Sequence, residues 1–100
     1  MSDEKEVVRV PMPHDDQMFG IVKRSLGNYR VEVACMDGNV RMGRIPGKMR
    51  KRNWIREGDV VIVKPWDVQG DEKCDIEYRY RNSQAQWLKK NGYLDLDKLK

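Results

Sequence analysis

Hydrophobic and polar residues alternate along much of this chain, which is the pattern of β-strands with one buried face. The clearest alternation covers residues 29–35, where every second side chain is apolar or aromatic: Tyr29, Val31, Val33 and Cys35. The same period predicts strands over residues 18–25, 40–46, 60–65 and 75–81. In the strand over 40–46, the alternation places Arg41 and Gly43 on one face and breaks at Arg44 and Ile45.

Turn residues separate these strands. Asp37-Gly38 is a strong hairpin signal, and Gly27-Asn28 also tolerates a turn conformation. A basic connection over residues 47–57 separates the third and fourth strands, and an acidic loop over 67–73 separates the fourth and fifth. Five short strands in this arrangement are typical of an all-β, five-stranded OB-fold Greek-key barrel. An SH3-like barrel remains the alternative architecture, because the number of strands does not exclude it.

One helix is predicted after the barrel. Ser83 and Gln86 have the spacing of a capping box, and Gly92 can provide the left-handed residue at the C-terminal end. Ala85 and Leu88 share a helical face that can lie on the barrel. The predicted organisation is a flexible N-terminal tail over residues 1–16, a barrel domain over 17–82, and a C-terminal helix and tail over 83–100 that pack on or near the barrel.

Length and hydropathy limit the class of protein. A chain of 100 residues suits one compact domain. The longest apolar run, residues 60–63, is far too short to span a membrane, and the N-terminus lacks the basic and apolar segments of a secretory signal. We therefore expect a cytoplasmic protein that makes no membrane contact, and we take a monomer as the default state.

Charge is distributed unevenly along the chain, although the net charge is only +4. Residues 18–66 contain eleven basic and four acidic side chains, hence +7, whereas residues 67–77 contain one and five, hence −4. Residues 38–56 contain seven basic side chains and no carboxylate. Crowded like charges raise the energy of the folded state, and the phosphates of a polyanion would relieve that repulsion. The pattern predicts nucleic-acid binding, with a solvated loop as the alternative.

The candidate binding residues lie on the second and third strands and in the basic connection. They are Arg30, Arg41, Arg44, Lys48, Arg50, Lys51, Arg52 and Trp54. Arginine binds phosphate through two parallel hydrogen bonds and stacks on bases, whereas lysine acts as a point charge. Trp54 either stacks on a base or, as we favour, anchors the connection to the core. Strands one to three offer only Phe19 and Tyr29 for stacking, so we expect recognition of phosphates and RNA shape.

The sequence contains no recognisable catalytic or cofactor motif, so we expect no enzyme activity and no cofactor. Cys35 and Cys74 form no CxxC or Cys/His cluster and are expected to be buried structural thiols. The single histidine, His14, is not expected to hold a metal, because most metal sites need three or four ligands. Asp37 and Asp59 adjoin glycines in turns, where aspartate stabilises the local backbone. We also considered a small ribonuclease, but this sequence offers no candidate acid and base for that activity.

The sequence resembles the translation initiation factor one A family that archaea and eukaryotes share. The similar segments are SLGNYRVEVACMDGNVRMGRIPGKMRKRNWI (25–55), DIEYRY (75–80) and SQAQWLKKNGYL (83–94). GKMRKRNWI after a DG hairpin is the specific part, because many RNA-binding modules share the barrel pattern. The long basic N-terminal and acidic C-terminal tails of the eukaryotic members have no counterpart here. The resemblance therefore does not extend to scanning or to partner recruitment through those tails.

The resemblance implies an S1-like OB-fold factor that binds the small ribosomal subunit near the A site. Its basic face would contact ribosomal RNA, and the protein would act with other initiation factors to place initiator tRNA and mRNA. By position, Arg30, Arg44, Lys48, Arg50, Lys51 and Arg52 would meet the RNA, and Trp54 would lie at the rim. The alternative is a general single-stranded RNA chaperone of the cold-shock type, against which the scarcity of aromatic residues counts.

Overall fold

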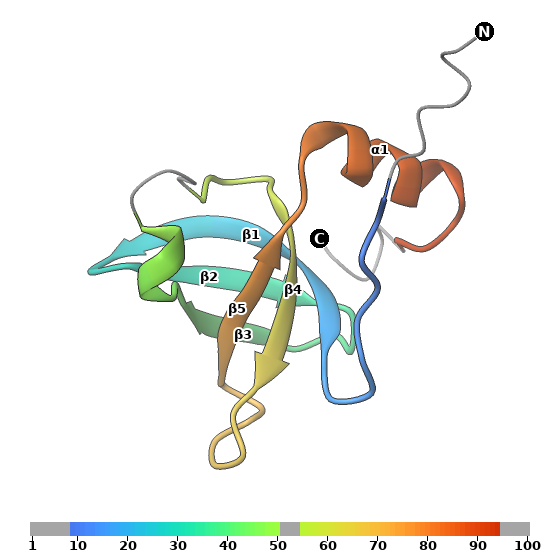
Figure 1. The fold of residues 1–100 in the computed structure, drawn as a ribbon. Helices are drawn as coiled ribbons and strands as arrows, with labels where there is room; N and C mark the ends of the chain where they lie inside the picture. Colours follow the sequence, from blue (N-terminus) through green and yellow to red (C-terminus); the bar gives the residue numbers. More distant parts are fainter. Residues whose placement is uncertain (1–8, 51–54, 95–100) are drawn as a thin grey trace, which may run out of the picture.

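In the part of the chain that the structure describes, five strands and one α-helix follow each other in the order that the sequence predicts (Figure 1). The computed structural model describes residues 9–50 and 55–94. The strands are β1 (Met18–Gly27), β2 (Arg30–Cys35), β3 (Val40–Arg44), β4 (Val60–Pro65) and β5 (Lys73–Arg79). A 3-10 helix, η2 (Gly47–Met49), lies between β3 and β4, and the helix α1 (Asn82–Lys90) follows β5. Within the described ranges, no helix is long and apolar enough to cross a membrane.

The strands close into a barrel in the order β1-β2-β3-β5-β4. Neighbouring strands are antiparallel except β3 and β5, which pair in parallel over residues 42–44 and 73–75. The barrel closes because β1 pairs with both β2 and β4. This five-stranded closure confirms the predicted OB-fold class.

The predicted strand boundaries are correct to within two residues. β4 covers the predicted range, while β1 extends to residue 27 rather than 25, and β5 covers residues 73–79 rather than 75–81. β3 ends at Arg44 rather than at residue 46. It therefore ends where the alternation breaks in the sequence, because from there the chain turns away from β5 into η2.

Among the described residues, the core consists of two clusters of buried side chains. The larger cluster fills the barrel and includes Val22, Val33, Val63 and Ile76, each at most 1% exposed. The smaller cluster is formed by Phe19, Val60, Ile62, Tyr80, Leu88 and Leu94. Burying an aliphatic or aromatic side chain of this size contributes about 1.5–3 kcal/mol. The smaller cluster therefore fixes α1 on the barrel, since Leu88 belongs to the helix.

α1 begins one residue before the predicted start, and its capping glutamine lies two residues earlier than predicted. Gln84, not Gln86, provides the capping interaction, because its Oε1 accepts a hydrogen bond from the backbone N–H of Arg81 at 2.8 Å. Leu88 is fully buried, as the predicted apolar face requires. Gly92 has a φ of 78°, which confirms the left-handed residue predicted after the helix.

The chain segment that precedes β1 lies against α1 and the barrel (Figure 1). The side-chain amide of Gln84 donates to the carbonyl of Arg9 at 2.7 Å, and the hydroxyl of Tyr80 donates to the carbonyl of Pro11. Val10 packs against the smaller core cluster. Residues 9–11, which the sequence assigns to the tail over 1–16, therefore contact the domain. Residues 1–8 lie outside the described residues.

The two cysteines are free and fully buried in the barrel, which confirms the prediction of structural thiols. A hydrogen bond with the Cys35 side chain, together with burial, raises the pKa of Cys74 well above its ordinary value. A buried, protonated thiol packs as a small apolar side chain. Cys74 therefore contributes to the barrel interior rather than to a reactive site.

Candidate nucleic-acid interface

Arg30 and Arg44 lie together at one end of the β2–β3 hairpin. They are direct partners in the antiparallel pairing of the two strands, and both are exposed. Side chains of such partners start about 4.5–5.5 Å apart at their Cβ atoms. The structure thus brings two of the predicted site residues together on the surface.

The basic connection after β3 begins with η2, which the core holds in place. Met49 is 7% exposed and packs in the larger core cluster, and its backbone N–H donates to the carbonyl of Pro46 at 3.0 Å. The residues on either side of this methionine, Lys48 and Arg50, are both exposed. The burial of Met49 therefore fixes η2 so that Lys48 and Arg50, two predicted site residues, face solvent. Lys51, Arg52 and Trp54, which the sequence also predicts, lie outside the described residues.

Two contacts position Arg50. Its Nε donates to the carbonyl of Ile45 at 3.1 Å, and its guanidinium carbon lies 4.4 Å from the ring centre of Tyr29. A cation–π contact at an exposed site contributes about 0.5–1 kcal/mol. Tyr29 is 49% exposed and has a φ of 60°, because it belongs to the turn before β2. The predicted alternation with Val31 therefore fails at Tyr29, and the ring lies on the surface beside a cation.

Arg44 is held against β5 by Asp75. Its Nε and Nη2 donate to the two carboxylate oxygens of Asp75 at 2.9 and 3.3 Å. Asp75 also accepts a hydrogen bond from Nε1 of Trp66 at 3.1 Å, and the Arg44 guanidinium lies 5.1 Å from the Trp66 ring centre. Exposed ion pairs contribute only about 0–1 kcal/mol. Arg44 remains 55% exposed, so the pair orients it and leaves part of it open to an anion.

Arg41 does not belong to the surface that the sequence predicts. It is 3% exposed, and its Nη1 and Nη2 donate to the two carboxylate oxygens of Asp37 at 2.9 and 2.7 Å. Its Nε donates to the carbonyl of Gly70 in the β4–β5 loop. The hydrogen bonds between the two side chains raise the pKa of Arg41 and lower that of Asp37. Arg41 therefore joins the β2–β3 turn to the β4–β5 loop, and its guanidinium is not available to a phosphate.

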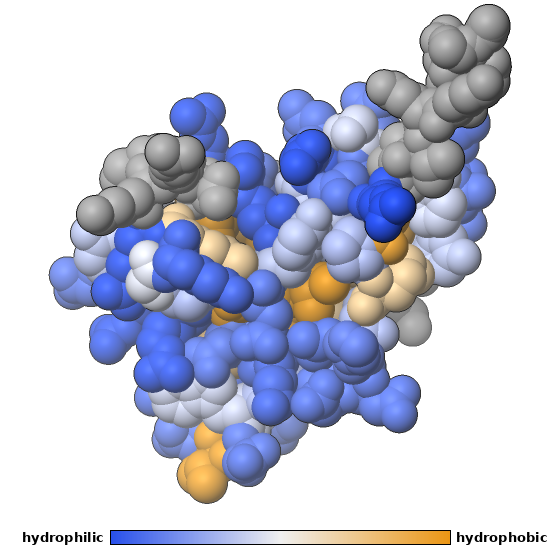
Figure 2. Space-filling model, in the orientation of Figure 1, coloured by the Kyte–Doolittle hydropathy of each residue, from blue (hydrophilic) through white to orange (hydrophobic). Residues whose placement is uncertain are grey.

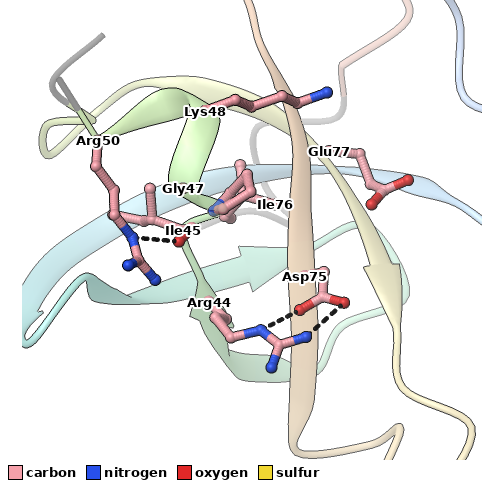
Figure 3. A pocket seen from close by; sticks show the side chains of 9 residues that line it. Arg44, Ile45, Gly47, Lys48, Arg50, Asp75, Ile76 and Glu77 are labelled. Carbon is pink, nitrogen blue, oxygen red and sulfur yellow. Dashed lines mark hydrogen bonds and ion pairs between the residues drawn. The ribbon is translucent and has the colours of Figure 1, made fainter. Parts of the chain in front are cut away.

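A cavity of about 520 Å³ lies between η2 and β5 (Figure 3). It exists because the pairing of β3 with β5 stops at residues 44 and 75, after which β3 ends and β5 continues. One wall carries Lys48 and Arg50, and the other carries Asp75 and Glu77. The cavity therefore has a cationic side and an anionic side.

The cationic side suits the binding of an anion. Arg30, Lys48 and Arg50 form no ion pair with any carboxylate of residues 9–50 and 55–94. Apart from Nε of Arg50, which donates to the carbonyl of Ile45, their donors can therefore bind phosphate oxygens. Figure 2 shows that hydrophilic residues cover most of this face of the molecule. Within residues 9–50 and 55–94, no group of three or more His, Cys, Asp or Glu side chains could hold a metal ion.

Three residues of this region were not assigned to the site from the sequence: Trp66, Asp75 and Glu77. The alternation of β5 does predict that residues 75 and 77 face outward. The alternation does not predict which strand lies next to β5. The parallel pairing with β3 places these carboxylates beside the basic connection.

Comparison with known proteins finds relatives that share one description and align with nearly the whole chain. The sequence model of a family described as Translation initiation factor 1A / IF-1 matches residues 5–99. Translation initiation factor 1A of Methanococcus maripaludis strain C7 is 54% identical over 88 residues, covering 88% of this chain and 85% of its own length. The protein of that name from Methanopyrus kandleri is 52% identical over 93% of this chain and 83% of its own length. The one from Pyrococcus abyssi is 53% identical over 87% and 77%, respectively.

Proposed function

The chain belongs to the translation initiation factor 1A family and is a translation initiation factor, and we propose that it acts by binding the small ribosomal subunit near the A site. Ribosomal RNA is the proposed ligand of the basic surface, which we define as Arg30, Arg44, Lys48 and Arg50. Lys51, Arg52 and Trp54 extend this surface in the sequence and are part of the proposal.

One observation carries the proposal: three exposed cations, Arg30, Lys48 and Arg50, are without carboxylate partners in the described part of the chain. Two of them flank a buried methionine, and the third lies at the end of the hairpin beside them. Their mutual repulsion falls when phosphates replace solvent counterions, so binding should be strong and salt-dependent. Folded RNA provides closely spaced phosphates on a rigid surface, which suits cations held on a barrel.

The proposed role is to help position initiator tRNA and mRNA together with other initiation factors, in the cytoplasm and as a monomer. The protein would contribute binding and orientation rather than a chemical step. Its rigid barrel supports this role, because a fixed set of cations selects one orientation on the RNA.

Co-sedimentation with purified small ribosomal subunits tests the proposal. We expect saturable binding of the wild-type protein that weakens as salt rises. If about four phosphates are neutralised, log affinity should fall with log salt at a slope of roughly −3. The Arg30→Ala/Lys48→Ala variant should bind more weakly, with a slope shallower by about 1.4–1.8, because each lost phosphate contact removes about 0.7–0.9.

The matched control is Lys89→Ala/Lys90→Ala, which removes the same charge from two exposed residues of α1. We expect this variant to keep most of the affinity and the wild-type slope. Equal losses in both variants would mean that binding depends on net charge and not on the basic surface. A Lys51→Ala/Arg52→Ala variant tests whether the rest of the connection contributes.

Free single-stranded RNA, added as a competitor, separates the two functions considered from the sequence. A factor that recognises the small subunit should remain bound in the presence of excess competitor. Easy displacement by single-stranded RNA would instead favour a general RNA chaperone.

A further inference from the structure

The carboxylates on the anionic wall of the cavity between η2 and β5 differ in what they already bind. Asp75 accepts three hydrogen bonds, two from Arg44 and one from Trp66. Glu77 is exposed and accepts one bond, from Nε2 of Gln17 at 3.3 Å, among the described residues. A carboxylate offers about four lone-pair positions. Glu77 therefore retains free acceptor positions, whereas those of Asp75 are largely occupied.

The orientation of Glu77 is defined by the segment before β1. The Oε1 atom of Gln17 accepts the backbone N–H of His14 at 2.8 Å, so its amide nitrogen is directed to Glu77. The bond from Gln17 to Glu77 is long and engages only one carboxylate oxygen of Glu77. The other oxygen has no partner among the described residues. Figure 3 shows Glu77 projecting from β5 in the direction away from Gly47 and Arg50.

A free carboxylate beside a phosphate-binding surface repels phosphates, since like charges close together raise the energy of the complex. It therefore favours a different part of an RNA, namely a base edge that carries hydrogen-bond donors. In unpaired RNA the Watson–Crick edge of the base is exposed and can be read. Among the four bases, guanine presents two adjacent donors there, N1–H and the N2 amino group, which match the two oxygens of a carboxylate.

We propose that Glu77 reads the Watson–Crick edge of one unpaired guanine in the RNA that the basic surface binds. This inference rests on the proposed function. Lys48 and Arg50 on the opposite wall would hold the phosphates of that nucleotide. The cavity of about 520 Å³ has the size of a small-ligand site.

Short RNAs that differ in one base test this inference. Fluorescence anisotropy would compare wild-type binding to UUUUUUU, UUUGUUU and UUUAUUU, and to the same RNA with inosine at the centre. We expect the guanine RNA to bind about tenfold more tightly than the uridine and adenine RNAs. Inosine lacks the N2 amino group and should bind with intermediate affinity.

Two variants with the same change in charge separate base reading from general electrostatics. In Glu77→Gln the affinity ratio of the guanine and uridine RNAs should fall to near one, because an amide nitrogen replaces one acceptor. Asp71→Asn, in the β4–β5 loop away from this cavity, should keep the wild-type ratio.

Several outcomes would overturn the inference while leaving the proposed function intact. Each applies to a protein that still co-sediments with small subunits. The first is equal affinity of the wild-type protein for all four RNAs, and the second is a guanine preference that survives in Glu77→Gln. The third is no binding of any of the RNAs at 50 mM salt. Loss of co-sedimentation by the wild-type protein would instead overturn the proposed function itself.

Discussion

Replacing Arg41 with methionine should destabilise the fold and leave RNA binding unchanged. The substitution keeps most of the apolar stem of the side chain but removes the guanidinium that binds Asp37 and the carbonyl of Gly70. Breaking a fully buried ion pair by removing one partner costs about 3–5 kcal/mol. Here the Asp37 side chain is 36% exposed and can be rehydrated, so we expect a loss of about 2–3 kcal/mol in the free energy of unfolding.

Urea unfolding followed by tryptophan fluorescence measures this loss, since the chain contains three tryptophans. The control is Arg30→Met, the same substitution at an exposed residue of the neighbouring strand, which should change stability by no more than about 0.5 kcal/mol. In contrast, Arg30→Met should weaken co-sedimentation with the small subunit, and folded Arg41→Met should not. If Arg41→Met were as stable as the wild type and bound the subunit more weakly, the structural role of Arg41 would be refuted.

Two further predictions concern stability. Because Arg41 lowers the pKa of Asp37, the stabilisation from Asp37 is present above its unfolded pKa of about 3.9 and is lost as pH falls through the lower folded value. Chemical unfolding at decreasing pH should therefore show stability falling below about pH 4, with a smaller decrease in Arg41→Met. A Cβ atom at Gly20 would lie 2.5 Å from the Val33 side chain, so Gly20→Ala should cost about 1–3 kcal/mol. Gly47→Ala, where no heavy atom lies within 4 Å of the new Cβ, should leave the unfolding midpoint nearly unchanged.

The sequence alone determined the positions of the strands along the chain and the segment in which positive charge is concentrated. Alternation predicted the five strands to within two residues, because a half-buried strand must place every second side chain in the core. The buried Leu88 followed from helical spacing in the same way. The cations of the basic connection were evident from their clustering, since charge depends on composition and not on packing.

The tertiary structure alone decided the direction and surroundings of the polar residues. Alternation divides β3 into a face with Arg41 and Gly43 and a face with Val40, but it does not say which face is inside. The Arg41 face is buried because Gly43 leaves room for Ile76 and Val33, and because Asp37 and Gly70 supply partners for the guanidinium.

The neighbours of the basic connection also follow from long-range pairing. Glu77 is thirty residues from residue 47 in the sequence, yet both line one cavity because β3 and β5 pair in parallel and then separate. Likewise, Tyr29 is on the surface because the turn before β2 places it there with a positive φ. Local patterns record the period of each strand, whereas strand pairing and packing decide which side chains meet and therefore what the surface can bind.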